Sequence, residues 1–298
     1  MEDEFMSSEG KSILEVRSLK KTFPKSGFSL DEVSFSLPYG SIMGFVGENG
    51  AGKTTTIGCI LGTLKKDAGT IKLFGKEISG DDIGTDIKEQ LGVAYDASNF
   101  SGDLTPQRIS KIMRGIYKQW DNDVFTKYLE KLHLPQKQKV STFSKGMTMK
   151  LAFAVAVSHS PKLLILDEVT SGLDPIARDE MLDMFLDFVQ DETKSIFISS
   201  HITSDLEKIA DYITFIHNGR VLLSVSTDDL LYKYGIVRCK TKQFAQIDKK
   251  DIISYIKKDY QVDVLVSDIE YIKQKYNGLI IDNVTIDNIL LLLVKGSR

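Results

Sequence analysis

The sequence has few cysteines, little net charge and no long apolar run, and each shortage excludes a class of protein. Cys59 and Cys239 are the two cysteines among 298 residues, so neither a disulfide framework nor the ligand spacing of a zinc site is present. The 38 basic and 41 acidic residues give a formal charge of −3, which offers no electrostatic footprint for nucleic acid. We therefore expect protein and small-molecule partners, no nucleic acid partner, and a reducing cytosol.

No stretch is apolar for long enough to cross a membrane. The longest purely aliphatic run covers residues 289–294, whereas a membrane-spanning helix takes about 20 apolar residues. Residues 1–11 are acidic and polar and lack the basic start and apolar core of a secretory signal, which predicts a flexible tail. The expectation is a chain without a transmembrane segment.

The strongest motif is GENGAGKT at residues 47–54, which matches the phosphate-binding pattern GxxxxGK[ST]. Residues 41–46 before it are expected to form a buried strand, and residues 54–64 after it a helix. A helix N-terminus offers unpaired N–H groups and the positive end of the helix dipole, which together stabilise an anion. Lys53 is then expected to reach the β- and γ-phosphates, and the Thr54 hydroxyl to ligate magnesium.

A second motif is LLILDE at residues 163–168, where four aliphatic residues precede Asp167 and Glu168. Such a run fits a strand buried on both faces of a parallel sheet, beyond whose carboxyl end ligands bind. Asp167 is expected to ligate magnesium, and Glu168 to act as the general base that activates water. Alone, two acids after a strand fit a surface turn equally well, but the upstream phosphate loop favours a nucleotide site.

The segments between these motifs differ in periodicity. Residues 13–16 and 31–35 predict strands of a β-rich edge, joined through a loop that contains Phe23. Residues 69–75 and 91–96 predict further strands. From about 97 to 160 helical spacing dominates, with Thr105 as an N-cap and Pro106 at the first helical position, which predicts an inserted helical subdomain.

The last third of the chain predicts one more buried strand, and beyond it a separate small region in which helices and strands alternate. Residues 195–201 predict a strand that ends at His201, followed by a helix with Ser204 and Glu207 as a capping box. Beyond residue 225 the chain predicts a small α/β region that is too small to be generously stable alone. Its helices are expected at 228–234, 247–260 and 285–294, and its strands at 236–239, 262–266 and 278–281.

Taken in order, the motifs resemble those of the ATP-binding subunit of ABC transporters. They are residues 47–54, FSKGM at 143–147, the acidic strand end at 164–168, SGLD at 171–174, and His201. The resemblance covers residues 12–225 and implies an α/β fold. Its parts are a P-loop ATPase core with a β-rich edge, the helical subdomain inserted at about 97–160, and a small C-terminal α/β appendage at 226–298. ATP and Mg²⁺ are the implied cofactors.

The resemblance also assigns roles to individual residues. It implies catalytic roles for Glu168 and His201, and magnesium ligation by Thr54, Asp167 and Asp96. It implies ATP binding by Phe23, Gly47, Asn49, Gly50, Gly52, Lys53, Thr54, Thr55, Ser144, Gly146 and Asp174.

Several of these residues would have a plain structural interpretation without the family. An aromatic residue such as Phe23 is more often core, Ser144 would be an N-cap, and His201 would be structural. In the family, the corresponding aromatic stacks on adenine and the histidine touches the γ-phosphate. The signature serine and glycine contact ATP held by the opposite subunit, and the aspartate corresponding to Asp174 links the two sites.

The chain departs from the family pattern at four positions. Asp96 stands where the family usually has glutamine, and its carboxylate suits magnesium or water, although the added charge leaves its role open. Lys145 and Met147 replace a glycine and the glutamine of the signature, and Lys145 either adds positive charge beside the phosphate or points to solvent. Val169 stands where proline is common.

The resemblance implies an ATPase at the cytoplasmic face of the cell membrane that powers export. Its partners would be an integral membrane permease on a separate chain, docked by the helical insert, and a second ATPase subunit, identical or related. The signature and residues 116–121 and 284–290 resemble exporters of peptides, drugs or antimicrobial compounds, with the phenol-soluble modulin group as one candidate. The alternative is a regulatory or soluble ABC ATPase that does not power transport.

Overall fold

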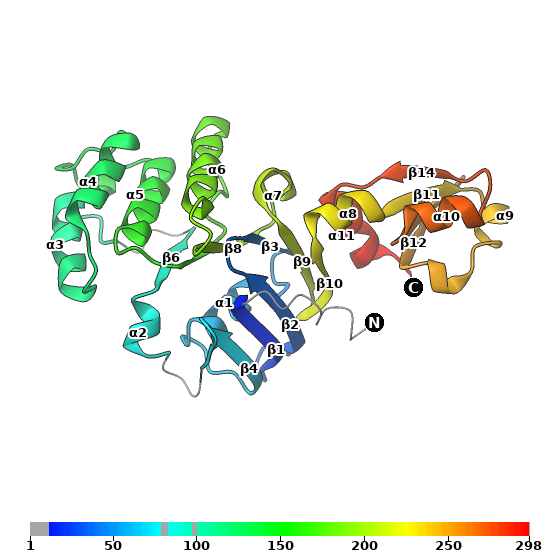
Figure 1. Cartoon of the computed structure of the whole chain (residues 1–298), viewed down its shortest axis with the longest axis horizontal. Coiled ribbons are helices and arrows are strands. Elements are labelled where there is room, and N and C mark those ends of the chain that lie inside the picture. Colours follow the sequence, from blue (N-terminus) through cyan, green and yellow to red (C-terminus); the bar gives the residue numbers. More distant parts are fainter. Residues whose placement is uncertain (1–11, 79–82, 97–99, 298) are drawn as a thin grey trace.

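A six-stranded sheet runs through the middle of the molecule and carries the phosphate-binding loop (Figure 1). The computed structural model describes residues 12–78, 83–96 and 100–297. The strand order is β10-β9-β3-β8-β7-β6, and all neighbours are parallel except β10 and β9. The strands are β3 (Ile42–Val46), β6 (Leu91–Tyr95), β7 (Leu163–Asp167), β8 (Ser195–Ser200), β9 (Tyr212–His217) and β10 (Arg220–Ser226).

The apolar runs of the sequence explain which strands are central. Every residue of β3, β7 and β8 is buried, as expected for strands covered on both faces. The predicted strands at 41–46, 91–96, 163–168 and 195–201 are confirmed to within one residue at each end. Strands β9 and β10 lie in a segment for which no element is predicted.

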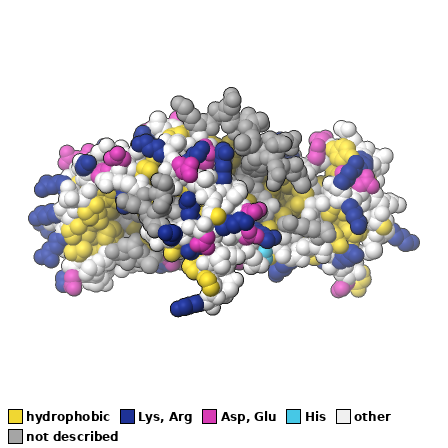
Figure 2. Space-filling view, turned by 90° about the horizontal axis from the view of Figure 1, so that it is seen from below, with side chains coloured by type: hydrophobic (Ala, Val, Ile, Leu, Met, Phe, Trp, Pro, Cys, Tyr) yellow, Lys and Arg dark blue, Asp and Glu magenta, His cyan; other side chains and the backbone are white. Residues whose placement is uncertain are grey.

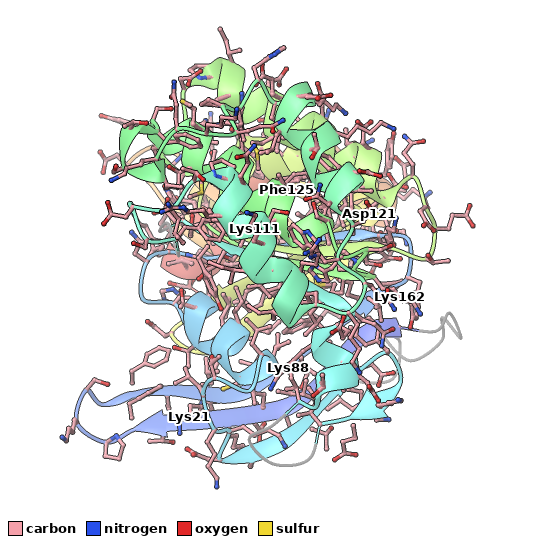
Figure 3. All side chains as sticks on the ribbon, turned by 90° about the vertical axis from the view of Figure 1, so that its left-hand side faces the viewer. Lys21, Lys88, Lys111, Asp121, Phe125 and Lys162 are labelled. Carbon is pink, nitrogen blue, oxygen red and sulfur yellow. The ribbon has the colours of Figure 1, made fainter. Side chains whose placement is uncertain are left out.

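A four-stranded antiparallel sheet forms the β-rich edge, with the order β2-β1-β4-β5. Its strands are β1 (Ser12–Phe23), β2 (Phe28–Pro38), β4 (Ala68–Leu73) and β5 (Lys76–Glu77). Strands β1 and β2 are longer than predicted because they pair as one hairpin along most of their length, and Figure 3 shows Lys21 on that hairpin. The stacked rings of Phe35 and Phe197, 5.4 Å between centroids, join this layer to the central sheet.

The helical subdomain covers the other end of the central sheet, at β6 (Figure 1). It contains α3 (Pro106–Ile116), α4 (Asn122–Lys131), the 3₁₀ turn η2 (Val140–Thr142) and α5 (Lys145–Val157). Thr105 caps α3 by accepting a hydrogen bond from the Arg108 amide, and Pro106 is its first residue, as predicted. Phe125, labelled in Figure 3, packs against Trp120 inside this layer. Residues 97–99 of the predicted insert lie outside the described part.

The remaining helices before residue 226 are α1 (Lys53–Ile60), α2 (Thr85–Lys88), α6 (Pro175–Val189) and α7 (Thr203–Ile209). Helix α1 ends before the predicted residue 64 because Gly62 adopts a left-handed conformation with φ of 67°. The predicted capping box at α7 is wrong. Its N-cap is Ile202, without a side-chain cap, and Glu207 accepts a hydrogen bond from the distant Ile286 amide instead.

The C-terminal α/β region contains an antiparallel sheet with the order β12-β13-β11-β14. Its strands are β11 (Gly235–Cys239), β12 (Ser254–Lys257), β13 (Val262–Val266) and β14 (Ile280–Asn283). Its helices are α8 (Thr227–Lys233), α9 (Thr241–Phe244), the 3₁₀ turn η3 (Lys249–Asp251), α10 (Ile269–Lys275) and α11 (Ile286–Lys295). Figure 1 shows this region at the end of the molecule opposite the helical subdomain.

The helix predicted at 247–260 is wrong. Those residues form η3 and strand β12, which pairs with β13 from Ser254 to Lys257. The apolar cluster Ile252, Ile253, Tyr255 and Ile256 is too short and too continuous to distinguish the period of a helix from that of a strand. The other predicted elements of the region are confirmed, with shifts of up to two residues at their ends.

The C-terminal region shares a hydrophobic core with the main domain. Ile286 and Ile289 of α11 are fully buried in the same cluster as Leu206 and Ile209 of α7. A smaller, separate cluster around Val237 and Val264 fills the interior of the region itself. The region therefore packs on the main domain, as its small size predicts.

Both cysteines are buried, Cys59 in α1 and Cys239 in β11. Burial raises the pKa of the Cys59 thiol to about 11, so it stays protonated at neutral pH. Within residues 12–78, 83–96 and 100–297, no helix combines the length and the apolar character needed to cross a bilayer.

Candidate nucleotide-binding site

The phosphate-binding loop connects β3 to α1 and requires glycine at two positions. A Cβ atom at Gly47 would lie 2.4 Å from the Ile216 carbonyl oxygen of the neighbouring strand. Gly52, the N-cap of α1, has φ of 116° and packs against Leu30 and Phe28. A side chain at either position would displace the loop, so both glycines set its path.

Lys53 places its ammonium group inside this loop. The side chain is buried, and Nζ donates to the Gly47 carbonyl at 2.7 Å and the Glu48 carbonyl at 3.2 Å. Nζ also lies 3.1 Å from Oε1 of Glu168. The positive charge thus lies inside the loop, and Lys53 is the first residue of α1, whose N-terminus favours an anion such as phosphate.

Thr54 and Asp167 are brought together as predicted. The Thr54 hydroxyl donates to Oδ2 of Asp167 at 3.0 Å, and the other Asp167 oxygen accepts from the Ser199 hydroxyl. Parallel pairing of β7 with β8 places Ser199 beside Asp167. Ser199 is a site residue that the sequence analysis misses, and its signal is its place at the same strand end as His201.

Glu168 lies between two cationic or potentially cationic groups. Its Oε1 faces Lys53, and its Oε2 lies 2.6 Å from Nδ1 of His201. The Glu168 backbone has φ of 56°, a left-handed conformation that costs a non-glycine residue on the order of 1–3 kcal/mol. Its amide donates to the Ser199 carbonyl at 3.1 Å, which holds the residue in that conformation beyond the end of β7.

Asp96 and Lys145 form an ion pair, which neither open interpretation of Lys145 anticipates. Nζ of Lys145 lies 2.5 Å from Oδ1 of Asp96, and the Asp96 amide donates to the Asp167 carbonyl at 2.9 Å. The ammonium also lies over Gly172, in the SGLD segment. The described residues contain no cluster of three acidic, histidine or cysteine side chains placed to hold a metal, so magnesium ligation by Asp96 stays a prediction.

Ser144, Gly146 and Asp174 lie at helix starts. The Ser144 hydroxyl caps α5 by accepting from the Met147 amide, and Asp174 caps α6 by accepting from the Ile176 and Ala177 amides. These amide hydrogen bonds, that of Ala177 first, lower the pKa of the Asp174 carboxyl. The Ser144 contact fits its plain structural interpretation as an N-cap, and Asp174 is an N-cap as well. The roles of both residues toward a second subunit stay predictions.

The remaining predicted ATP contacts surround the loop. Asn49 and Gly50 are exposed at its tip, and Thr55 is half-buried in the first turn of α1. Phe23 ends β1 rather than lying in a loop, and its ring centroid is 6.4 Å from that of Phe28. Because Phe28 packs against Gly52, this aromatic pair lies beside the phosphate-binding loop.

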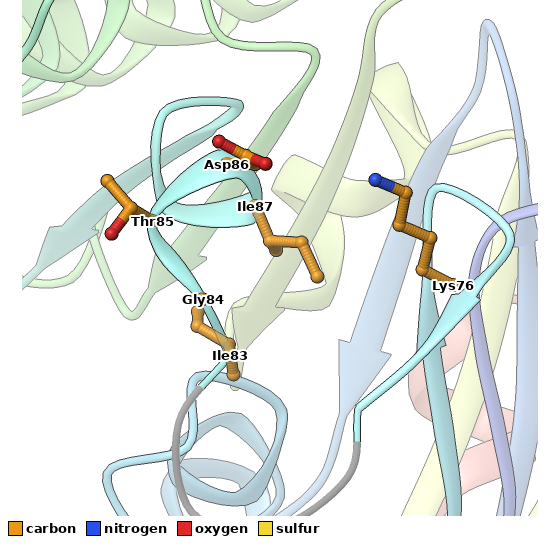
Figure 4. A pocket seen from close by; sticks show the side chains of 6 residues that line it. All are labelled: Lys76, Ile83, Gly84, Thr85, Asp86 and Ile87. Atoms are coloured by element: carbon orange, nitrogen blue, oxygen red, sulfur yellow. The ribbon is translucent and has the colours of Figure 1, made fainter.

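A pocket of about 380 Å³ lies elsewhere, between β5 and α2 (Figure 4). Lys76 and residues 83–87 line it, and no residue of the phosphate-binding loop does. The surface in Figure 2 carries acidic and basic side chains side by side, in keeping with the small net charge.

Comparison with known proteins shows the family to which this chain belongs. The ABC transporter family model matches residues 30–171. The bacitracin transport ATP-binding protein BcrA of Bacillus licheniformis is 36% identical over 224 residues, which cover 74% of this chain and 71% of that protein. The lantibiotic transport ATP-binding protein SrtF of Streptococcus pyogenes is 33% identical over 218 residues, 72% of this chain and 92% of that protein. The chain belongs to the ABC transporter ATP-binding family.

Solved structures agree with this assignment. An ATP-binding subunit of an ABC transporter superposes with a TM-score of 0.64 at 27% identity, covering 74% of this ABC ATPase and 92% of that chain. The cbiO1 protein of Clostridium perfringens has the same fold, with a TM-score of 0.63 at 22% identity over 74% and 90% of the two chains. The predicted α/β P-loop fold, the ABC family and its ATP-hydrolysing activity are confirmed.

Proposed function

We propose that this ABC ATPase binds Mg·ATP at the site built from Lys53, Thr54, Asp167, Glu168 and His201, and that hydrolysis there powers export. The observation that carries this proposal is the position of the Glu168 carboxylate. One of its oxygens contacts Lys53, and the other contacts His201. This arrangement joins the phosphate-binding group, the candidate base and the candidate γ-phosphate contact in one hydrogen-bonded set. Export fits the bacitracin and lantibiotic transport proteins among the relatives.

Binding and proton transfer have separate residues in this proposal. The loop N–H groups and Lys53 would hold the triphosphate, and the Glu168 carboxylate would take the proton from the attacking water. Thr54 and Asp167 are two hard oxygen donors 3.0 Å apart, a set that fits Mg²⁺ together with phosphate oxygens. The bound ion would neutralise charge on the phosphates, while Ser199 holds the Asp167 carboxylate in place.

The assembly part of the proposal concerns partners. Ser144, Gly146 and Asp174 would face the nucleotide of a second ATPase subunit, identical or related. The helical subdomain at about 97–160 would dock a separate integral membrane permease, and the chain would then lie at the cytoplasmic face of the membrane. The ATPase domain would span residues 12–225. A peptide or antimicrobial compound is the proposed cargo, with the phenol-soluble modulin group as a narrower candidate.

ATP turnover of the purified chain tests the chemistry. Glu168→Gln keeps the shape of the side chain but removes the base, so kcat should fall at least about 100-fold, the usual size for general base removal, while ATP still binds. Glu270→Gln, which makes the same chemical change at an exposed residue paired with Lys273 in α10, is the matched control. Wild-type rates in Glu168→Gln would end the hydrolase assignment of this residue.

Transport is tested separately from turnover. In membrane vesicles that contain the permease, ATP-dependent movement of a bacitracin-like peptide should disappear with Glu168→Gln and persist with Glu270→Gln. Turnover without any movement of such cargo would instead favour the regulatory or soluble ABC ATPase. Removal of Mg²⁺ with a chelator should abolish turnover and leave the fold intact.

A further inference from the structure

Two hydrogen bonds join the helix that follows His201 to the start of α11 in the C-terminal region. Helix α7 begins at Thr203, two residues after His201. The Thr203 hydroxyl donates to Oδ1 of Asp287 at 2.6 Å, and the Ile286 amide donates to Oε1 of Glu207 at 2.7 Å. Both partners lie at the start of α11, so the C-terminal region holds α7 at its first residue and again one turn later, at Glu207.

These contacts matter because α7 has little local support at its start. Its N-cap, Ile202, provides no side-chain hydrogen bond, although Ser, Thr, Asp or Asn at this position would. The Ile202 amide bonds to the Ser200 hydroxyl at 2.9 Å. Thr203 is buried, so its bond to Asp287 is shielded from water on the Thr203 side.

The opposite side of α7 is held by α6. Asp205 is buried and lies 3.9 Å from Nε of Arg178, and Lys208 pairs with Asp179 at 2.8 Å. Leu206 and Ile209 pack in the core shared with Ile286 and Ile289 of α11. Helix α7 is therefore clamped between α6, which follows the SGLD segment, and α11, which belongs to the C-terminal region (Figure 1).

His201 itself depends on this clamp. Its side chain is 44% exposed, so packing does little to fix the ring, and its backbone continues through Ile202 into Thr203, the first residue of α7. Moving the start of α7 would change the 2.6 Å contact between His201 and Glu168. A displacement of about 1 Å in a catalytic group is enough to reduce a rate strongly.

We propose that Thr203 and Asp287 are positioning residues for ATP hydrolysis: the C-terminal region sets the place of His201 through their hydrogen bond. The inference rests on the proposed function of His201 and Glu168. In this proposal the C-terminal region contributes to the chemical step, because α11 holds one side of α7 and α7 begins two residues after His201 in the chain.

The test uses the full chain and paired variants. Thr203→Val removes the hydroxyl at nearly constant volume, and Asp287→Ala removes the acceptor. Each should lower kcat about three- to tenfold, the size expected for one ordinary intramolecular hydrogen bond, with the KM for ATP changed less than about twofold. Thr203→Ser and Asp287→Asn retain a donor and an acceptor, so both should restore kcat. The double variant Thr203→Val, Asp287→Ala should be no slower than the worse single variant.

Two further measurements separate positioning from general damage. Asp282→Ala breaks the ion pair with Arg238 inside the C-terminal region and should leave kcat unchanged. Amide hydrogen exchange over residues 200–206 should rise in Thr203→Val and Asp287→Ala, and not in Asp282→Ala. The proposal would be overturned if Thr203→Val and Asp287→Ala left both kcat and amide hydrogen exchange unchanged. An equal loss of activity in Asp282→Ala would also overturn it. A wild-type chain without ATP turnover would instead refute the proposed function, and exchange would still report on the clamp.

Discussion

At the scale of single residues, the carboxylate of Asp96 and the ammonium group of Lys145, both departures from the family pattern, form an ion pair. Asp96 places a carboxylate near the acidic end of β7, where its amide bonds to the Asp167 carbonyl. Lys145, in the signature segment, neutralises that carboxylate at 2.5 Å. Asp96 thus follows β6 while Lys145 begins α5, so their pair links the central sheet to the helical subdomain. The two departures from the family pattern are best understood together.

This pair predicts opposite effects of its two single variants on ATP binding. Lys145→Ala leaves Asp96 unpaired beside the site, so the Kd for ATP should rise about two- to fivefold, in line with an ion pair worth up to about 1 kcal/mol at the surface. Asp96→Asn should lower the Kd or leave it unchanged, and the double variant should lie near the wild type. Fluorescent ATP titration at low salt measures this.

The matched control is Lys139→Ala, which breaks the exposed pair with Asp103 in the same subdomain. Its Kd for ATP should not change. Equal weakening by Lys145→Ala and Lys139→Ala would show that loss of any positive charge is responsible, rather than release of Asp96.

The site residues whose positions could be predicted from the sequence are those whose place follows from the path of the backbone. Lys53 and Thr54 follow a glycine loop of set length, and Asp167 and Glu168 end an apolar strand, so motif and strand order bring them together. The partner of Lys145 could not be found in this way. It lies just after β6, far from Lys145 in the sequence, and the ion pair depends on how the helical subdomain meets the sheet.

At the scale of elements, the wrong predictions come from segments whose contacts are distant. Ser204 and Glu207 have the spacing of a capping box, yet the long-range bond from the Ile286 amide takes the Glu207 carboxylate. The apolar residues near 252–256 form a strand because β13 offers a pairing partner. Conversely, Thr105 and Pro106 suffice to start α3 locally, which is why that helix start is confirmed.

One element junction predicts a pH effect on stability. His159, at the end of α5, is buried, stacks on Tyr117 at 3.9 Å and bonds through Nε2 to the Leu91 carbonyl. Burial holds the pKa of His159 below its ordinary value, so the folded protein binds this proton less readily than the unfolded chain. The free energy of unfolding should therefore fall as pH drops below about 6.5, the ordinary histidine pKa.

Urea unfolding between pH 7.5 and 5.5 measures this dependence. His159→Gln keeps a donor for Leu91 but cannot titrate, so its stability should fall less steeply with decreasing pH. His133→Gln, at an exposed position, should keep the wild-type slope. The same slope in all three proteins would contradict the assignment to His159.

At the scale of the whole molecule, the C-terminal region shares one hydrophobic core with the ATPase domain. The core around α7 includes α11, so the boundary near residue 225 divides the chain by motif but not by packing. The sequence predicts that a small region packs on something, from its size alone. Which helix it covers is decided by three-dimensional contacts that no local pattern contains.

Removal of residues 227–298 should therefore destabilise the ATPase domain. It would expose Leu206, Ile209 and their neighbours, and each fully buried aliphatic side chain contributes about 1.5–3 kcal/mol. Trp120, the single tryptophan, lies in the helical subdomain and reports on the ATPase domain in both proteins. Its fluorescence should show unfolding of the fragment at a lower urea concentration. Equal midpoints would show that the region is an independent module.

The two buried thiols have a practical consequence. Because Cys59 and Cys239 are enclosed in α1 and β11, maleimide and nitroxide reagents should spare them in the native chain. Single cysteines introduced on the surface, one at either end of the molecule, can then carry spin labels without prior removal of native cysteines. The chain thus lends itself to spectroscopic distance measurements that follow the helical and C-terminal ends as nucleotide is added.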